Sequence, residues 1–407
     1  MLALFFLTYV VYAKKVTTLP LLQRGGASTH SDECGPSTEQ NVEVVVLDYN
    51  DLVNGVDLTQ EIGKAYGVDG IGLLTVSNVP GLKEARRRLL PLAQKFAVLD
   101  EATQLKYEDP KSHYSFGWSL GKEKLEGKPD LSKGSYYANP QYDRPVSDPD
   151  LMAKYPAFLG NNIWPAEEDV PDFEGAFKSL GQLIVDVGKL VAEQCDAYVK
   201  KMCEEHAYEP GRLCRIIDTS VCCKARLLHY FSKGPEEAGE HGGQLAKEAD
   251  FSSWCGWHND HGSLTGLTSA MYLDESGHEK ENKDKMAGLY IKGRKGQLVK
   301  AGFPQDHLAF QIGETAQVHS GGILQATPHA VRGSSDPGVS RETFAVFMEP
   351  NWDELMDIPE GMDLEKAQGR EALKHLPSGV PPLSRRWTGN RQDFGDFTEA
   401  TIKAYYD

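Results

Sequence analysis

Two histidines and an aspartate fall within four consecutive positions of the chain, in the segment His258-Asn259-Asp260-His261. Imidazole nitrogens and carboxylate oxygens are common ligands of divalent transition metals. In an extended chain, residues i and i+2 point the same way, so His258 and Asp260 can reach one ion while Asn259 points elsewhere. His261 faces the opposite side and is the weaker ligand candidate. A His-x-Asp triplet alone is weak evidence, because most such triplets are polar surface turns.

A mononuclear iron site for oxygen chemistry needs two imidazoles and one carboxylate on one face of the metal, with the other positions open. The second imidazole therefore has to come from a distant strand, and the downstream histidines are His278, His307, His319 and His329. His278 lies in a charged loop and His307 begins a predicted strand, so both are most simply solvated or capping residues. His319 precedes a Gly-Gly turn. His329 is the informative one, because Arg341 follows twelve residues later (341 − 329) on a predicted strand.

Arg341 suggests how the chain would bind an anion beside the metal. A guanidinium offers two parallel donors to a carboxylate, which suits the recognition of a small dianion. The formal net charge of −16 argues against a protein that holds nucleic acid or an anionic membrane through a general positive field. An anion must therefore be bound locally, and we expect a small-molecule substrate, no nucleic acid and no stable membrane span.

The elements that must position these residues begin with a β-α-β pattern. Residues 42–49 and 70–79 are β-branched runs with a short predicted helix, 58–67, between them. Residues 81–110 have apolar positions at helical spacing, and Pro91 predicts a kink or division of that helix. The pattern is lost between 111 and 165, where an aromatic, Gly- and Pro-rich stretch is read as loops that could line a pocket.

An apolar stripe after Pro171 predicts a helix of about 30 residues, whose apolar positions belong to the structural core. Beyond residue 220 the pattern changes to short β runs separated by turn-rich breaks, which is typical of an all-β barrel or sandwich. The 40 glycines of the chain fit many turns and short strands. The predicted strands are 224–232, 265–274, 287–293, 297–302, 307–313, 315–320 and 341–350.

The compartment is indicated by the cysteines and by the amino terminus. Seven cysteines, an odd number, suit a reducing compartment better than a disulfide scaffold. Residues 1–13 are apolar but too short for a membrane span, which needs about 20 residues. They are read as a targeting leader, an unprocessed extension or a gene-model artefact, and residues 16–40 as a flexible lead-in. We expect a cytoplasmic monomer.

In their order along the chain, these residues resemble the iron(II)- and 2-oxoglutarate-dependent dioxygenases, in particular the branch of isopenicillin N synthase and the plant oxygenases. The motifs are His258-x-Asp260, then His329, then Arg341-x-Thr343. The surroundings are similar too, in the β-α-β opening, in NIWP before the long helix, in GLYIKGRKGQLV and in IGETAQVHSGG. The resemblance covers about residues 42–352, some three quarters of the 407 residues.

The resemblance implies a role for each matching residue. His258, Asp260 and His329 would be the catalytic metal ligands of Fe(II). Arg341 would pair with the distal carboxylate of the cosubstrate 2-oxoglutarate, with help from the hydroxyl of Thr343, where the family commonly has serine. Tyr230 stands where many members place a tyrosine that contacts the same carboxylate.

Besides Thr343 in place of serine, two features depart from the family pattern. Leu228 stands where plant members often have asparagine, which makes the role of Tyr230 less secure than that of Arg341. The interval of 71 residues between the first and last ligands (329 − 258) is somewhat long, and the charged loop 275–285 is expected to take up the excess by projecting from the barrel.

The implied fold is mainly β with flanking helices: a double-stranded β-helix (jelly-roll) core behind an α+β amino-terminal region. The predicted organisation is a leader or extension (1–40), an amino-terminal dioxygenase region (41–165), the long helix with the β-helix core (166–352), and a carboxy-terminal tail with a candidate lid helix (353–407). The implied activity is oxidation of a small metabolite by O2, by hydroxylation or desaturation, with release of succinate and CO2.

Three other activities stay open at this stage. A same-fold iron oxidase that does not use 2-oxoglutarate could employ Arg341 for another carboxylate. A non-catalytic β-barrel binding module would be favoured by loss of a triad residue, and none is lost. A zinc hydrolase built on His258, Asp260 and His261 lacks an obvious general base and leaves Arg341 unexplained.

Overall fold

The computed structural model describes residues 44–122, 124–125, 128–203, 208–232, 255–389 and 391–406. The predicted leader at 1–13 and the lead-in at 16–40 lie outside the described residues. Within those ranges, no helix has both the length and the apolar character that crossing a membrane requires.

Two facing β-sheets form the centre of the molecule. The larger is a nine-stranded sheet in the order β1-β2-β13-β9-β15-β7-β6-β3, with β10 paired to β15, and the smaller has the order β12-β11-β14-β8. Their strands are β1 (Val45–Asp48), β2 (Leu73–Ser77), β3 (Gly117–Leu120), β6 (Lys133–Ala138), β7 (Lys224–Tyr230), β8 (Cys255–His258), β9 (Leu264–Thr268), β10 (Met271–Asp274), β11 (Gly288–Lys292), β12 (Leu298–Ala301), β13 (Leu308–Ile312), β14 (His329–Arg332) and β15 (Val339–Met348). A further two-stranded sheet joins β4 (Lys124–Leu125) to β5 (Lys128–Pro129).

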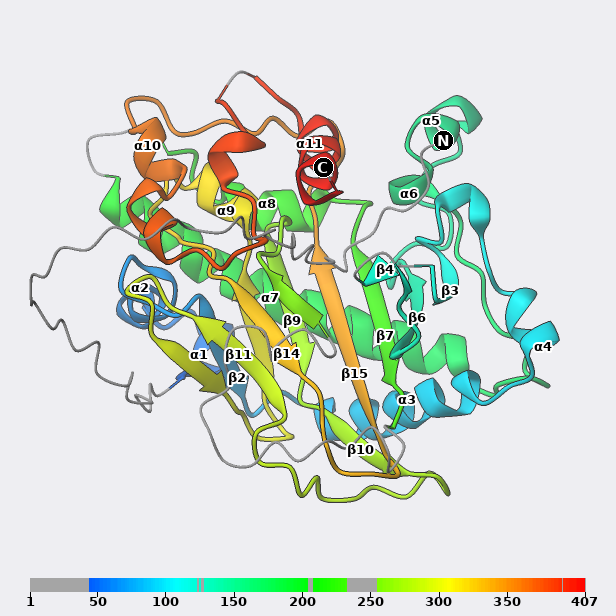
Figure 1. Ribbon diagram of the computed structural model, residues 1–407. Helices are drawn as coiled ribbons and strands as arrows, with labels where there is room; N and C mark the ends of the chain where they lie inside the picture. The colour runs from blue at the N-terminus through cyan, green and yellow to red at the C-terminus, as the bar shows by residue number, and fades with distance from the viewer. Residues whose placement is uncertain are drawn as a thin grey trace, which may run out of the picture.

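Helices cover the outer face of the larger sheet, as Figure 1 shows for α3 (Leu82–Ala97) and α7 (Phe173–Met202) behind β15 and β7. The remaining helices are α1 (Tyr49–Val53), α2 (Thr59–Tyr66), α4 (Glu101–Leu105), α5 (Pro149–Lys154), α6 (Pro156–Leu159), α8 (Arg212–Thr219), α9 (Glu314–His319), α10 (Leu364–Ala367) and α11 (Phe394–Tyr406), with 3-10 turns at Pro110–Ser112, Arg370–His375 and Leu383–Arg385. This arrangement of helices, large sheet and small sheet is the predicted mainly β fold with a jelly-roll core.

The long predicted helix is present as α7, which spans 30 residues. Its apolar stripe is buried: Phe177, Leu180 and Ile184 are fully inaccessible to solvent. The β-α-β opening is also present, with β1 and β2 parallel and α2 between them. The main hydrophobic core runs from Leu47 to Met348, so both the amino-terminal region and the β-helix region contribute to it.

Helix α3 continues through Pro91 and ends at Ala97, so the segment is not divided near the proline, and the alternative, a kink at Pro91, stays a prediction. The helical conformation is interrupted further along, between Val98 and Asp100. The Asp100 carboxylate accepts a hydrogen bond from the backbone N–H of Thr103 and so starts α4 as a new helix. A capping side chain divides the segment where the proline does not.

The stretch 111–165 is more regular than predicted, since it includes β3 and β6, which extend the large sheet beyond β7. Its aromatic residues, which include Tyr114, Phe116 and Trp118, were expected to lie in loops that could line a pocket. Phe116 and Trp118 instead belong to the protein interior, with 0% and 2% of their surface exposed. A Cβ on Gly134 would lie 2.0 Å from the Trp118 ring, which shows how tightly the indole is packed.

Two of the predicted strands take another form. Residues 315–320 form most of helix α9, because the turn after β13 starts a helix at Glu314 rather than another strand. Residues 265–274 divide into β9 and β10, which both pair with β15 at different points along it.

The predicted helix near the carboxy terminus is present as α11, and Phe394 and Phe397 bury it against Phe158 and Trp387. A role for α11 as a lid stays a prediction.

Candidate active site

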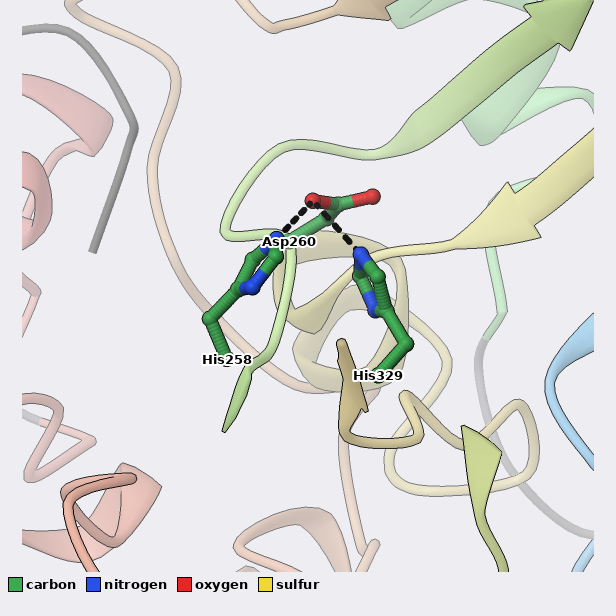
Figure 2. A group of neighbouring side chains, drawn as sticks. All are labelled: His258, Asp260 and His329. Carbon is green, nitrogen blue, oxygen red and sulfur yellow. Dashed lines mark ion pairs between the residues drawn. The ribbon is translucent and has the colours of Figure 1, made fainter. Parts of the chain in front are cut away.

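The three predicted metal ligands meet at one point between the two sheets. His258 ends β8, His329 begins β14, and the two are register partners in this antiparallel pair. Asp260 lies in the turn that follows β8. Its Oδ1 is 3.8 Å from Nε2 of His258 and 3.7 Å from Nε2 of His329, and Figure 2 shows both rings directed at the carboxylate. One ligand atom from each residue lies within 4.8 Å of the others.

Nδ1 of each imidazole, the ring nitrogen that points away from Asp260, contacts another group of the protein. Nδ1 of His258 lies 2.8 Å from the carbonyl oxygen of Gly256. Nδ1 of His329 lies 3.5 Å from the carbonyl oxygen of Thr327 and 2.6 Å from the side-chain amide nitrogen of Gln311. A carbonyl oxygen can accept the Nδ1 proton of a metal-binding histidine, which fixes the ring orientation and leaves Nε2 for the ion. Two imidazoles and one carboxylate on one side of an open space fit Fe(II), and they suit it better than a closed structural zinc site with four protein ligands.

Burial makes the protonation of the metal-free cluster asymmetric. Burial alone would lower the pKa of His258, but the neighbouring Cys255 thiol and the Asp260 carboxylate raise it to about 9. Burial and the nearby His258 lower the pKa of His329 to about 4. A metal ion that binds Nε2 of His258 therefore competes with a proton for this ring.

A pocket of about 1340 Å³, including its part open to solvent, leads from the triad. Arg341, Thr343 and Tyr230 line the same pocket as the three ligands. Arg341 and Tyr230 are register partners on β15 and β7, with the guanidinium carbon 4.9 Å from the centre of the tyrosine ring. The structure thus brings all six predicted site residues into one cavity. Leu228, also in its lining, is the register partner of Thr343.

The four other histidines considered as ligands lie elsewhere. His261 is buried, with its ring stacked on Phe394 at 5.3 Å between centres. Nε2 of His319 lies 3.0 Å from the carbonyl oxygen of Leu355. His307 lies 3.3 Å from the Thr75 hydroxyl, and His278 is exposed in the charged loop. None of these four belongs to the metal-binding group found among the described residues.

Three residues of the site were not predicted from the sequence. Gln311 lies on β13 and contacts His329, Cys255 lies on β8 with its sulfur 3.7 Å from Nδ1 of His258, and Arg226 lines the pocket from β7. Only Cys255 had a local signal, since it precedes His258 by three positions. Gln311 and Arg226 become neighbours of the site because the large sheet, which holds both, faces the small sheet that carries His258 and His329. No short motif reveals that packing.

Comparison with known proteins agrees with this geometry. No family model matches the chain. A curated relative, the homoarginine-6-hydroxylase 2-ODD-233 of rice, is 24% identical over 274 residues, which is 67% of this chain and 71% of the relative. A 2OG-Fe(II) oxygenase family protein from Caulobacter crescentus aligns with a TM-score of 0.61 and 18% identity, over 88% of this chain and 98% of that one.

Further solved structures have the same fold. A full-length Neurospora crassa protein in complex with α-ketoglutarate and thymine aligns with a TM-score of 0.61 and 18% identity, over 90% of this chain and 99% of that one. JOX2 in complex with 2OG, Fe and JA gives a TM-score of 0.53 at 14% identity, over 91% of both chains. The fold, the triad and the curated relative all agree with the resemblance of this chain to the iron(II)- and 2-oxoglutarate-dependent dioxygenases. The resemblance seen in the sequence is confirmed.

Proposed function

We propose that the protein is a non-haem iron(II) enzyme that uses O2 and 2-oxoglutarate to oxidise a small organic metabolite, with release of succinate and CO2. The observation that supports this most directly is the shared cavity: the His258-Asp260-His329 cluster and Arg341 line one pocket. When bound, iron and the oxoacid supply the oxidising chemistry. The protein supplies binding, orientation and exclusion of water.

In this proposal the triad holds iron through Nε2 of His258, Nε2 of His329 and an oxygen of Asp260. The ionised carboxylate compensates part of the metal charge, and the two neutral imidazoles add none. All three side chains line the pocket, so an iron ion that they held would be accessible from it and would supply the binding of the oxoacid and of O2. Binding of iron competes with a proton for Nε2 of His258.

Arg341 would hold the distal carboxylate of 2-oxoglutarate. It is 7% exposed, so a charge-assisted hydrogen bond there is shielded from water. Thr343, two residues along the same strand, can add a hydroxyl donor from the same face. Tyr230 supports the guanidinium with its ring, which keeps a planar cation in one orientation.

The rest of the pocket favours a neutral or anionic substrate. Among the described residues of its lining, Asp260 is the sole carboxylate, and the proposal assigns it to iron. Two cationic side chains line the same space besides Arg341, which the proposal assigns to 2-oxoglutarate: Arg226 and Lys300. Apolar wall residues, including Leu267, Val331 and Phe347, would hold the body of the substrate and keep water from the oxidising centre.

An anaerobic titration of the purified protein with Fe(II) and then 2-oxoglutarate tests the proposal. A chelated oxoacid gives a weak visible charge-transfer band, which should appear and should be absent from His329→Ala. Iron binding without the band would favour the oxidase that uses no 2-oxoglutarate, and no iron binding would favour a non-catalytic binding module. Succinate formation under air, with O2 consumed, then separates oxygenase from hydrolase.

A substrate panel can be chosen from the relatives. Homoarginine is named for the rice relative, and thymine is bound by the Neurospora protein. The lining charges predict that neutral or acidic compounds stimulate succinate formation more than homoarginine, a cation. Stimulation by homoarginine alone would contradict the substrate class inferred from the pocket.

We further propose that the chain acts as a monomer in the cytoplasm. All six described cysteines are free thiols, as expected in a reducing compartment. Sedimentation of the purified chain would test the oligomeric state, and fractionation of cells that express the full chain would test the compartment.

A further inference from the structure

The loop that presents Asp260 rests on helix α9. We call residues 259–263, between β8 and β9, the ligand loop. The backbone N–H of Glu314 donates to the carbonyl oxygen of Asp260 at 2.8 Å, and that of Gly313 donates to Ser263 at 3.0 Å. The Thr315 hydroxyl donates to the carbonyl oxygen of His261 at 2.6 Å. The first turn of α9, whose N–H groups have no partner within the helix, is thus satisfied by the ligand loop.

The side chain of Glu314 links this loop to the carboxy-terminal part of the chain. It accepts a hydrogen bond from the amide of Asn259 at 2.9 Å, and Asn259 stands between two metal ligands. It also receives two hydrogen bonds from the Arg386 guanidinium, at 2.5 and 2.6 Å. The side chains of Arg386 and Glu314 are 0% and 2% exposed, so this bidentate ion pair is fully enclosed.

Arg386 is itself held by the carboxy-terminal segment. It donates to the Thr401 hydroxyl on α11 at 3.2 Å and to the carbonyl oxygen of Pro381 at 3.1 Å. Its guanidinium lies 5.7 Å from the ring centre of Phe397 and 5.9 Å from that of Tyr405. A second contact from α11, the stacking of Phe394 on His261, reaches the ligand loop directly.

We propose that Arg386 is a positioning residue for the metal site, acting through Glu314 and Asn259 to fix the ligand loop. The segment that follows β15, the last strand of the barrel, is then part of the iron site without providing a ligand. The inference rests on the proposed function, since it assigns Asp260 to iron. None of the three residues in this chain of contacts belongs to the metal-binding group or to the pocket wall that surrounds Arg341.

The physical reason is the geometry that a metal ligand requires. Asp260 belongs to a turn, and its backbone is held by neighbours such as α9. Removal of Arg386 leaves the carboxylate of Glu314 buried without its charge partner, and Glu314 then has to reorient or take up a proton. Either change alters the bond to Asn259 and moves the residue between the two ligands. Loss of such outer contacts typically weakens metal binding about 10- to 100-fold.

The test compares Fe(II) affinity in four full-length proteins under anaerobic conditions, by competition with a chromogenic chelator. Arg386→Met and Asn259→Ala should each bind Fe(II) at least about 10-fold more weakly than wild type. The double variant should be little weaker than Arg386→Met alone, because both substitutions break one chain of contacts. Asn259→Ala keeps the ion pair, so it tests the link even if Arg386→Met folds poorly.

Trp387→Phe is the matched control. Trp387 is next to Arg386 and fully buried, and its indole N–H donates to the carbonyl oxygen of Met356 at 2.7 Å rather than to the ligand loop. It should lower the unfolding temperature but leave Fe(II) affinity within about threefold of wild type. Equal losses of affinity in Trp387→Phe and Arg386→Met would mean that Arg386 acts through general stability, which overturns the proposal.

Multiplicative losses in the double variant would also overturn it, since they would make the two side chains independent. The same cycle measured on denaturant unfolding of the metal-free protein should show coupling between Arg386 and Asn259. That measurement needs no iron. If wild type bound no Fe(II), the proposed function would fail, while the metal-free cycle would still decide whether the two residues are linked.

Discussion

His258 and His329 face each other across paired strands, with 4.1 Å between their ring centres. They are 71 positions apart in the sequence (329 − 258), yet antiparallel pairing of β8 with β14 makes them direct neighbours. Asp260 is carried to the same point by the turn after β8. The metal site is therefore a product of strand register, and a slip of one residue in β14 would turn the His329 ring to the other face of the sheet.

The triad predicts a clear division among the buried histidines. Asp260→Ala and His258→Ala should abolish Fe(II) binding, because only two ligands would remain. His319→Ala should keep it, since that ring contacts the carbonyl oxygen of Leu355 and lies outside the metal-binding group. Metal content after anaerobic loading and desalting measures both. Stoichiometric iron in Asp260→Ala would refute the site.

Much of this site was predictable because its residue types are rare in combination. His258, Asp260, His329 and Arg341 stand out in the sequence by chemistry and order. Their partners do not: Gln311 is one glutamine among several, and only the packing of the two sheets brings β13, on which it lies, to His329 on β14. A sequence motif can identify the metal ligands, whereas the residues that orient those ligands are brought to them by the tertiary structure.

The secondary structure was predicted correctly where a single hydrophobic pattern runs through a long segment. It was predicted wrongly where tertiary contacts determine the conformation of a short one. The apolar stripe of α7 continues for about eight turns, and it was predicted to within a few residues. Residues 315–320 were predicted as a strand, but 315–319 belong to α9, where the ligand loop supplies acceptors for the first turn of the helix. Tertiary context overrides local propensity at such short segments.

Arg341 provides the second prediction. Arg341→Leu should retain iron but lose 2-oxoglutarate affinity by about 2–5 kcal/mol, because a buried carboxylate would lose its charged partner. This corresponds to a dissociation constant raised at least about 30-fold. Titration of the charge-transfer band with 2-oxoglutarate measures it. Tyr230→Phe is the control: it keeps the ring beneath the guanidinium and should have a much smaller effect on oxoacid affinity. An unchanged oxoacid affinity in Arg341→Leu would show that Arg341 does not bind the carboxylate.

The third prediction concerns Gly313, where the neighbouring backbone leaves no room for a side chain. Its φ of −101° is open to any residue, but a Cβ there would lie 2.0 Å from the carbonyl oxygen of Gly262 in the ligand loop. Gly313→Ala should therefore displace the ligand loop and lower both stability and Fe(II) affinity. Gly302→Ala, which meets no atom within 4 Å, is the matched control and should bind iron as wild type does. If both variants bound Fe(II) equally well, the ligand loop would have more freedom than its packing indicates.

The last prediction concerns Glu349 and the pH dependence of the free energy of unfolding. Its carboxyl is fully buried beside β15, and burial raises its pKa to about 8 from an ordinary value of 4.5, helped by the charge of Asp260 and opposed by Lys224. Because the folded pKa is raised, this group's contribution to stability is complete below pH 4.5 and is lost as pH rises toward 8.

Glu349→Gln carries no such proton, so its stability relative to wild type should increase between pH 5 and pH 8, by at most about 1.4 kcal/mol per pH unit. Denaturant unfolding of the metal-free proteins across this range measures the difference. Glu101→Gln, at the exposed start of α4, should run parallel to wild type. Parallel curves for Glu349→Gln as well would mean that Glu349 is ionised in the folded protein, so that Lys224, itself buried, offsets the cost of burying the carboxylate.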